Sequence, residues 1–522
     1  MVLEKKLSVP KKWEYIIPIF ATLSLIISCV IVSPKKFFWL DELFSFYLLS
    51  DPNFSHMMAA LSDKINSAPP LYFILGWLWA KLFNSTELSL RLFSSLGICA
   101  AFVTVWITLR RIYNFWSASI GTLAAFCLSS VILEQNAETR FYGLFIAVCA
   151  LGLLQYEIIN RQEKCSFAVL LFNTSIHGAI ILTHIFGFLY SGAILFSLLI
   201  RDRYFNFFRP SVYLSIVLGW LLFIPWINSF QNQADAGKPH SWIPIPNLIE
   251  LINSFSFSQA LAVLLVILLG ISYLLFSNEA QFEKIVNAQQ KSLAETSFLI
   301  LAYSVLAVPV VAWIISRTLE SIFVSRYMIP ITISWSILLT YLSSRIFPSV
   351  VASKIYGSSS SKRLIVKQKI SLIMLMVFLV TYPILYAKSY GTQQLPGLKD
   401  DSYGYTELPI AVESPHVYLP RFYYSPKHNR YFFILDWQAA LDKGNLLNST
   451  VDYKVMAALK RNYPAQNIVQ GKDFLDRYNR FLVLDEDKRR WFEMRIKNNP
   501  KYTFRYVDKV DGINLLLVDE RI

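Results

Sequence analysis

The sequence predicts a polytopic α-helical membrane protein with an α/β domain outside the membrane at its C-terminal end. Two observations predict this fold class. First, 55% of the 522 residues are hydrophobic and only 16% are charged, a balance too apolar for a soluble protein of this size. Second, long apolar runs recur up to about residue 389, and the composition beyond it is that of a soluble domain. We therefore expect a membrane domain at 1–389 and an extramembrane domain at 390–522.

The basic residues follow membrane topology. A formal net charge of +14 would suggest nucleic-acid binding in a soluble protein. Here, however, Lys and Arg fall mostly in short loops between apolar runs, as the positive-inside rule describes for cytoplasmic loops. We therefore expect no nucleic-acid partner.

The N-terminal segment MVLEKKLSVPKKWEY is basic and leads into the first apolar run. That run has no small-residue cleavage site and continues towards Pro34, so we expect an uncleaved first transmembrane helix rather than a removed signal peptide. A span needs about 20 mostly apolar residues, and roughly eleven such runs are present. The expected spans are 15–33, 92–109, 115–133, 141–159, 166–183, 185–200, 211–228, 257–276, 294–315, 327–344 and 370–387.

The segment 69–83, PPLYFILGWLWAKLF, decides the orientation of everything after it. It is nearer 15 than 20 apolar residues long, and Trp77, Trp79 and Lys81 suit a helix lying at the interface. If it does not cross, the cytoplasmic loops collect most of the lysines and arginines, including the basic loop 354–369. We therefore expect a cytoplasmic N-terminus and a C-terminal domain on the outer side.

The region after residue 390 alternates between strand-like and helix-like runs. Strands are expected at 410–414 (IAVES), 431–436 (YFFILD), 480–487 (RFLVLDED) and 513–518 (INLLLV), with a helix at 452–463. This alternation predicts a small α/β domain. Asp436 and the acidic residues 485–487 end strand-like runs and are expected to be ordinary caps. The five cysteines show no CxxC pair and none lies in this region, so neither a disulfide framework nor a zinc site is indicated.

Under this topology, unusual polar residues gather on the outer side near the membrane surface. They are Asp41 and Glu42; Glu134, Glu138 and Arg140; His184; and Arg317, Glu320 and Arg326. Each has a plainer interpretation: a solvated loop start, a snorkelling arginine, or a helix-end histidine. Because an ionisable group at membrane depth costs about 2.5 to 3.5 kcal/mol, several groups of both signs on one face favour a shared polar cavity.

Arginines beside carboxylates suit an anionic substrate that needs a base nearby. An arginine fork binds phosphate, and a carboxylate can remove the proton from an acceptor hydroxyl as it attacks an anomeric carbon. A polyprenyl phosphate is a good leaving group, so a general acid is less needed than in glycoside hydrolysis. No P-loop or Rossmann fingerprint is present, which argues against direct use of a nucleotide. These features favour glycosyl transfer from a lipid-linked phosphosugar.

A series of short motifs extends this interpretation. In order, they are WLDE (39–42), SAPPLYF (67–73), SLRLFSSL (89–96), EQNAETRFYGL (134–144), THIFG (183–187), FIPW (223–226) and SRYMIP (325–330). In order and sidedness this series resembles the bacterial GT-C glycosyltransferases of the protein O-mannosyltransferase type. It resembles in particular the subgroup with the lipid A aminoarabinose transferase and the rhizobial lipopolysaccharide-core glycosyltransferases.

The resemblance implies a role for individual residues. The family's catalytic aspartate falls on Asp41, with Glu42 beside it, and its RY pattern falls on Arg326 and Tyr327. Its EARxY pattern falls on residues 138–142, with Thr139 in place of the small residue. Its HPPLY pattern falls on residues 68–72, where Ala68 replaces the histidine, so a metal or acceptor role for that position is not carried over.

We therefore expect an inverting GT-C glycosyltransferase on the outer, periplasmic face of a bacterial inner membrane. It would move a sugar from a polyprenyl-phosphate donor to a lipid, polysaccharide or protein acceptor. Asp41 is the expected base, Glu42 a support or metal contact, and Arg140 and Arg326 the donor-phosphate ligands. The residues expected to line the cavity are Glu138, Tyr142, His184, Tyr327, Pro70 and Tyr72. A divalent cation is left open as a cofactor, because no ligand set of recognisable spacing requires one.

Two other classes of protein share some of these features. A transporter or flippase of a lipid-linked glycan would also need a charged cavity, but it would more often show inverted repeats and polar groups at the membrane midplane. In this sequence the charges gather at one surface instead. A membrane-anchored binding module that uses the C-terminal domain would leave the Asp41 loop without a role.

Overall fold

The computed structural model describes residues 10–239, 243–255, 293–346, 359–397, 399–400, 404–445 and 449–521. The chain forms two compact units. The first, here called the helical unit, comprises Met1–Ser33, Arg91–Ile224 and Ile245–Tyr390. The second, called the sheet unit, comprises Pro34–Leu90, Pro225–Pro244 and Gly391–Ile522.

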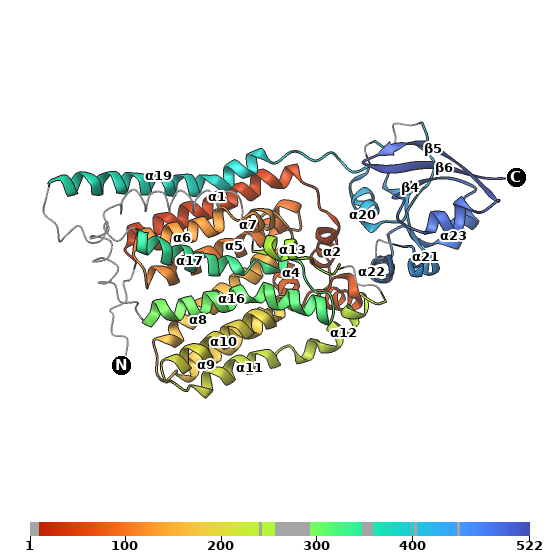
Figure 1. The fold of residues 1–522 in the computed structure, drawn as a ribbon. Helices are drawn as coiled ribbons and strands as arrows, with labels where there is room; N and C mark the ends of the chain where they lie inside the picture. Colours follow the sequence, from red (N-terminus) through yellow and green to blue (C-terminus); the bar gives the residue numbers. More distant parts are fainter. Residues whose placement is uncertain are drawn as a thin grey trace. The chain divides into compact units, whose positions relative to one another are not determined.

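The helical unit is a bundle of long apolar helices (Figure 1). Its helices are α1 (Ile16–Val32), α5 (Glu87–Arg110), α6 (Phe115–Cys127), α7 (Ser130–Gln135), α8 (Tyr142–Asn160), α9 (Phe167–Thr183), α10 (Gly187–Tyr204), α11 (Pro210–Leu221), α13 (Leu248–Ser254), α16 (Leu293–Thr318), α17 (Ile331–Ile346) and α19 (Ser359–Ser389). Neighbours in the bundle include α6 with α17, α9 with α11, α10 with α16, and α1 with α19. Among the described residues, six helices are long and apolar enough to cross a membrane, judged by length and composition alone.

Ten of the eleven predicted spans can be compared with these helices, and their number as membrane crossings stays a prediction. The span expected at 257–276 lies outside the described residues, and each of the others overlaps a helix. Two are interrupted. The run 211–228 is divided among α11, the short helix η4 (Ile224–Trp226) and α12 (Ile227–Asp235). The run 115–133 forms α6 and α7, because Ser129 caps a new helix by accepting a hydrogen bond from the Ile132 amide at 3.4 Å.

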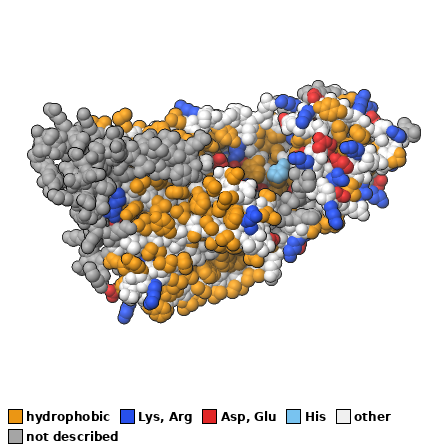
Figure 2. Space-filling view, viewed as in Figure 1, with side chains coloured by type: hydrophobic (Ala, Val, Ile, Leu, Met, Phe, Trp, Pro, Cys, Tyr) orange, Lys and Arg blue, Asp and Glu red, His pale blue; other side chains and the backbone are white. Residues whose placement is uncertain are grey.

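The outward faces of the helices are apolar. On α1, Ile19, Phe20 and Leu23 are exposed, and on α19 the exposed residues include Met374 and Val377. Figure 2 shows hydrophobic side chains over much of the visible surface of the helical unit, and charged side chains gathered over the sheet unit. An apolar surface of this extent is typical of contact with lipid.

The sheet unit contains a six-stranded mixed sheet in the order β3-β2-β1-β4-β6-β5. The strands are β1 (Ile410–Val412), β2 (Tyr431–Leu435), β3 (Ile468–Gln470), β4 (Arg480–Asp485), β5 (Tyr502–Val510) and β6 (Ile513–Glu520). Strands β3, β2, β1 and β4 are parallel, β6 runs antiparallel to β4, and β5 runs antiparallel to β6. The accompanying helices are α20 (Pro415–Tyr424), α21 (Trp437–Leu441), α22 (Ser449–Asn462) and α23 (Gly471–Arg477).

The strands expected from sequence are β1, β2, β4 and β6, and α22 is the expected helix. Strands β1 and β2 are buried along their whole length, as central parallel strands are. Their sequences are therefore continuous apolar runs, which the sequence analysis could recognise. The sequence analysis missed β3 and β5. Strand β3 has only three residues, and β5 is an edge strand whose residues Thr503 to Tyr506 are exposed, so neither shows an apolar run.

The sheet unit also contains the segment 34–90, with helices α2 (Leu40–Leu49), α3 (Phe54–Ala60) and α4 (Leu71–Phe83). Polar contacts join this segment to the part of the sheet unit after residue 390, here called the sheet domain. The Asp63 carboxylate accepts from Arg461 at 2.8 Å, and the Phe38 amide donates to the hydroxyl of Tyr424 at 2.8 Å. The Tyr463 hydroxyl donates to the buried carboxylate of Asp51 at 2.7 Å. The first predicted outer loop is therefore built together with the C-terminal domain.

Candidate functional site

In the helical unit, three turns bring the predicted site residues together. The turn 138–141 precedes α8, the residues 184–186 separate α9 from α10, and the short helix η5 (Ser325–Met328) precedes α17. His184 is extended (φ −154°, ψ 141°), so it ends α9, and its carbonyl accepts from the Gly187 amide at 2.8 Å as the next helix starts.

Arg326 and Tyr142 form the central contact. The Arg326 Nε donates a hydrogen bond to the hydroxyl of Tyr142 at 2.9 Å. Tyr142 is fully buried at the start of α8, whereas Arg326 is half-buried. The phenol is thus fixed by its packing, and it restricts the orientation of a guanidinium that solvent can still reach in part.

Arg140 lies near the same phenol. Its guanidinium carbon is 5.9 Å from the centre of the Tyr142 ring and 4.8 Å from that of Phe141. Its amide donates to the Glu138 carbonyl at 2.9 Å, and its carbonyl accepts from the Ser94 hydroxyl at 2.9 Å. Two arginines therefore contact the same tyrosine and bring two positive charges to this part of the helical unit.

His184 and Tyr327 complete an aromatic wall. Their rings are 4.6 Å apart, and the Tyr327 ring stacks 6.2 Å from that of Tyr142. The His184 Nδ1 accepts a hydrogen bond from the Phe186 amide at 3.1 Å, which is the role of a helix-end histidine. Tyr190, which the sequence analysis did not identify, donates from its hydroxyl to the Tyr327 carbonyl at 3.5 Å. Only its buried position reveals it, because a tyrosine inside a predicted span carries no sequence signal.

In the sheet unit, Asp41 and Glu42 lie in the first turn of α2, after the N-cap residue Trp39. Asp41 is half-buried and Glu42 is fully buried. Acidic residues in a first helical turn also stabilise the helix through its dipole, so this position suits either a structural or a catalytic role.

The other two predicted residues of this unit lie at the start of α4. Pro70 is the N-cap residue, and Tyr72 is fully buried with its ring 5.3 Å from that of Phe73. Helices α2 and α4 pack against each other. The predicted site residues therefore form two groups, one in each unit, and a single cavity shared by both groups stays a prediction.

No metal centre can be built from the described residues, since no three His, Cys, Asp or Glu side chains among them are grouped to hold an ion. Arg317, which the sequence analysis also placed on the outer side, is exposed and donates to the Pro246 carbonyl at 2.9 Å. Its guanidinium lies over Trp313 at 5.1 Å, so Arg317 belongs to a different set of contacts from Arg326.

The fold is similar to that of a membrane protein of known structure. The chain is similar to ArnT from Cupriavidus metallidurans in its apo state, with a TM-score of 0.55 and 11% identity over 96% of this chain and 97% of that one. It is similar to the same protein bound to undecaprenyl phosphate, with a TM-score of 0.54 and 12% identity over the same shares. No protein-family model matches the chain, and no curated protein matches its sequence.

The class is therefore that of helical membrane proteins with the GT-C fold and a C-terminal domain built on a sheet. Within that class, the chain has the architecture of ArnT along nearly its whole length. The expected resemblance to GT-C proteins is confirmed at the level of the fold.

Proposed function

We propose that this protein is an inverting glycosyltransferase that uses a polyprenyl-phosphate sugar on the outer face of a bacterial inner membrane. The observation that carries the proposal is the pair Arg140 and Arg326 around the buried Tyr142. It occurs in a fold shared with ArnT, whose crystal structure contains undecaprenyl phosphate. Two arginines on an aromatic wall suit a phosphate whose lipid remains in the bilayer.

The arginines would bind the donor phosphate. A guanidinium offers parallel N–H donors that match two phosphate oxygens, and its charge stabilises the negative charge that grows as the sugar–phosphate bond breaks. Because Tyr142 already orients Arg326, less conformational freedom is lost when the phosphate binds. Tyr327 and His184 would then form the wall beside the donor.

Asp41 would act as the general base. The acceptor hydroxyl oxygen attacks the anomeric carbon, its proton passes to the Asp41 carboxylate, and the bond from that carbon to the phosphate oxygen breaks. Polyprenyl phosphate leaves with the bonding electron pair, and one displacement inverts the anomeric configuration. Glu42, buried beside Asp41, would support the position of α2. Since the described residues form no metal-binding group, none of these steps is assigned to a metal ion.

The test is the variant Asp41→Asn, which keeps the shape of the side chain and removes the base. A positioned general base contributes about 10²-fold to 10⁴-fold, so transfer should fall by that range while donor binding is retained. Transfer and binding are measured in vesicles with a polyprenyl-phosphate sugar. Glu42→Gln, the adjacent matched variant, should cost less.

Three outcomes contradict parts of the proposal. Transfer by Asp41→Asn at the parental rate removes the base assignment. A larger loss in Glu42→Gln moves the role to the neighbouring carboxylate. If the purified protein moves a lipid-linked sugar across vesicles without transferring it, the chain is a flippase.

A further inference from the structure

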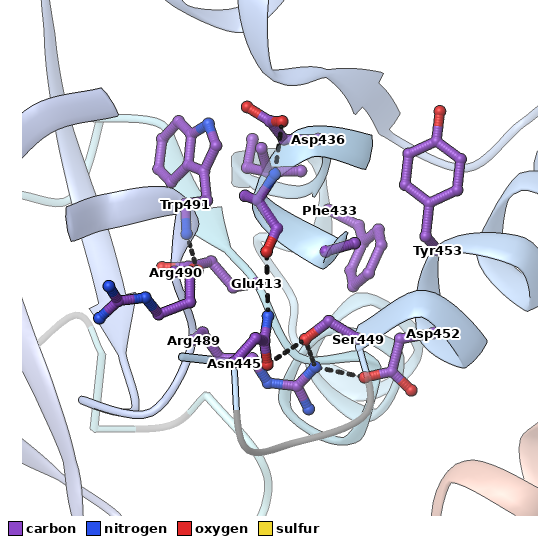
Figure 3. A pocket seen from close by; sticks show the side chains of 13 residues that line it. Glu413, Phe433, Asp436, Asn445, Ser449, Asp452, Tyr453, Arg489, Arg490 and Trp491 are labelled. Carbon is purple, nitrogen blue, oxygen red and sulfur yellow. Dashed lines mark hydrogen bonds and ion pairs between the residues drawn. The ribbon is translucent and has the colours of Figure 1, made fainter. Parts of the chain in front are cut away.

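We propose that a pocket in the C-terminal domain, at the carboxyl edge of its parallel strands, binds a neutral saccharide. The pocket is a small hollow that is open to solvent, and its enclosed space is about 30 Å³, so a ligand would rest against the lining residues at its mouth. The residues that carry the argument are Glu413, Asn445, Ser449, Asp452, Tyr453 and Arg489, all of which line it (Figure 3). The role suggested here, docking of an acceptor glycan, rests on the proposed function, whereas saccharide binding itself does not.

The position of the pocket in the sheet is that of a ligand site. Strand β1 has β2 on one side and β4 on the other, so the strand order reverses direction at β1. Glu413 follows β1 directly, and Asp436, which also lines the pocket, follows β2. In open α/β sheets, ligands bind at the carboxyl ends of parallel strands where the order reverses.

Glu413 provides a second, independent sign of a ligand. Its side chain is 8% exposed, and one carboxyl oxygen accepts from the Trp491 amide at 3.1 Å (Figure 3). The other oxygen, Oε1, is buried and has no hydrogen-bond partner in the part of the chain that the structure describes. Burial, with Asp485 and Glu493 nearby, raises the pKa of Glu413 to about 8. At neutral pH it is therefore mostly a neutral acid that can both donate and accept.

Apart from Glu413, the charged side chains that line the pocket already have ion-pair partners. Asp436 pairs with Arg495 at 2.6 Å, and Asp452 pairs with Arg489. Arg490 pairs with Asp442 at 3.1 Å. The helix N-termini also have acidic partners, because Asp436 caps α21 and Asp452 lies in the first turn of α22. Neither an anion nor a cation is favoured, so the ligand is a neutral polar molecule.

The polar groups of the lining form a connected chain that suits hydroxyl groups. Arg489 donates to the Ser449 hydroxyl at 2.9 Å, and that hydroxyl donates to the Asn445 side-chain oxygen at 3.0 Å (Figure 3). A hydroxyl donates one hydrogen bond and accepts two, so a polyol can join such a chain of donors and acceptors. Tyr453 is half-buried and packs 5.0 Å from Trp437, which gives the pocket a flat apolar side for a sugar ring.

The test measures binding without any donor. The full-length protein in lipid nanodiscs is examined by saturation-transfer NMR with methyl α-D-mannopyranoside, methyl β-D-xylopyranoside and methyl α-L-rhamnopyranoside. We expect at least one glycoside to bind. Tyr453→Ala and Asn445→Ala, as two independent variants, should each weaken that binding by about fivefold to tenfold. Tyr506→Ala, a matched change at an exposed tyrosine on β5 outside the pocket, should not.

Glu413→Gln separates a neutral ligand from a charged one. Glutamine keeps a donor and an acceptor, so glycoside binding should stay within about threefold of the parental value. The proposal is overturned if none of the three glycosides binds, or if binding is unchanged in both Tyr453→Ala and Asn445→Ala. It is also overturned if Glu413→Gln abolishes binding and methylammonium competes, which indicates a cation site.

A transfer assay then separates the two proposals. If the saccharide is the acceptor, Tyr453→Ala should raise the acceptor KM and leave kcat nearly unchanged, because the pocket touches no reacting atom. Glycoside binding with an unchanged KM removes the acceptor role and keeps the saccharide site. Glycoside binding by a protein that transfers no sugar removes the proposed function alone.

Discussion

At the scale of single residues, the hydrogen bond from Arg326 to the buried Tyr142 restricts the orientation of the Arg326 guanidinium. Such a bond matters because a guanidinium and an ammonium differ in shape although they carry the same charge. Only the guanidinium is planar and can bind Tyr142 and a phosphate together in a fixed geometry. If only the positive charge mattered, lysine would serve as well as arginine at these positions.

This distinction gives a prediction for Arg140→Lys and Arg326→Lys. Each variant keeps the positive charge and loses the fork, so we expect the KM for the polyprenyl-phosphate sugar to rise about tenfold. Initial rates against donor concentration measure the effect. Arg317→Lys is the matched control, because Arg317 is exposed and bound to Pro246 instead, and its KM should stay at the parental value. Parental KM values in all three variants indicate that the arginines are only anchors.

Glu413 gives a pH-dependent prediction. Its pKa is raised from 4.5 to about 8 in the folded domain, so the unfolded chain releases this proton at lower pH than the folded chain. Its contribution to stability is complete below pH 4.5 and is lost as pH rises through 8. Because Glu413 ionises over this range, the free energy needed to open the sheet should fall by up to about 1.4 kcal/mol per pH unit. Asp485, with a pKa raised to about 6, has largely finished titrating above about pH 7.

Hydrogen exchange of the β1 and β4 amides between about pH 7 and 8 checks this slope, after correction for the intrinsic exchange rate. Glu413→Gln resembles the protonated acid, so it should flatten the slope and make the domain more stable than the parent at pH 8. An equal slope in parent and variant would show that Glu413 ionises normally.

At the scale of elements, the crossing of α5 and α8 places the start of the arginine site. Gly97 and Gly143 lie against each other there: a Cβ on Gly143 would come within 1.9 Å of the Ser94 carbonyl oxygen. The same crossing lets the Ser94 hydroxyl donate to the Arg140 carbonyl. Small residues at such crossings allow the helix backbones to approach closely, as is common in membrane proteins.

Gly143→Ala should therefore force α8 away from α5 and move Arg140 and Tyr142. Overpacking of this kind typically costs about 1 to 3 kcal/mol, and we expect a lower melting temperature and at least tenfold weaker transfer. Thermal unfolding in detergent and a transfer assay measure both. Gly192→Ala on α10 is the matched control, because a Cβ there meets nothing within 4 Å. If Gly143→Ala and Gly192→Ala have the same melting temperature and transfer rate, the close approach of α5 and α8 is not required for function.

At the scale of the whole molecule, the sheet unit takes in a segment that the sequence analysis had assigned to the membrane domain at 1–389. Residues 34–90 pack with the C-terminal sheet domain through contacts such as Asp63 with Arg461 and Asp51 with Tyr463. Segments that pack together must lie on one side of a membrane. The structure therefore favours the same side of the membrane for residues 34–90 and for the C-terminal domain.

Topology reporters test this arrangement. Helix α4 has 13 residues, so it is about 20 Å long, shorter than the roughly 30 Å hydrocarbon layer. We expect α4 not to cross, and reporters fused after Ser85 and after Gln394 should both report the periplasmic side. A cytoplasmic signal at either position means that the span count and the orientation are wrong.

The fold class, most of the helices and four of the six described strands could be predicted from the sequence alone. Hydropathy depends on composition over a run of residues, so α5 or β2 is readable without knowing its neighbours. The sequence also identified the capping role of Asp436, whose carboxylate accepts from the Ala439 amide at 3.0 Å, because a cap is a local interaction.

Which residues come into contact could be learned only from the folded structure. Tyr142 and Arg326 are 184 positions apart, Asp51 and Tyr463 are 412 apart, and nothing in the local sequence around either pair encodes the contact. The burial of Glu413 and the small residues between α5 and α8 were equally invisible, because burial depends on how distant elements pack. Local propensity fixes the elements, but the packing of elements far apart in the chain fixes the site.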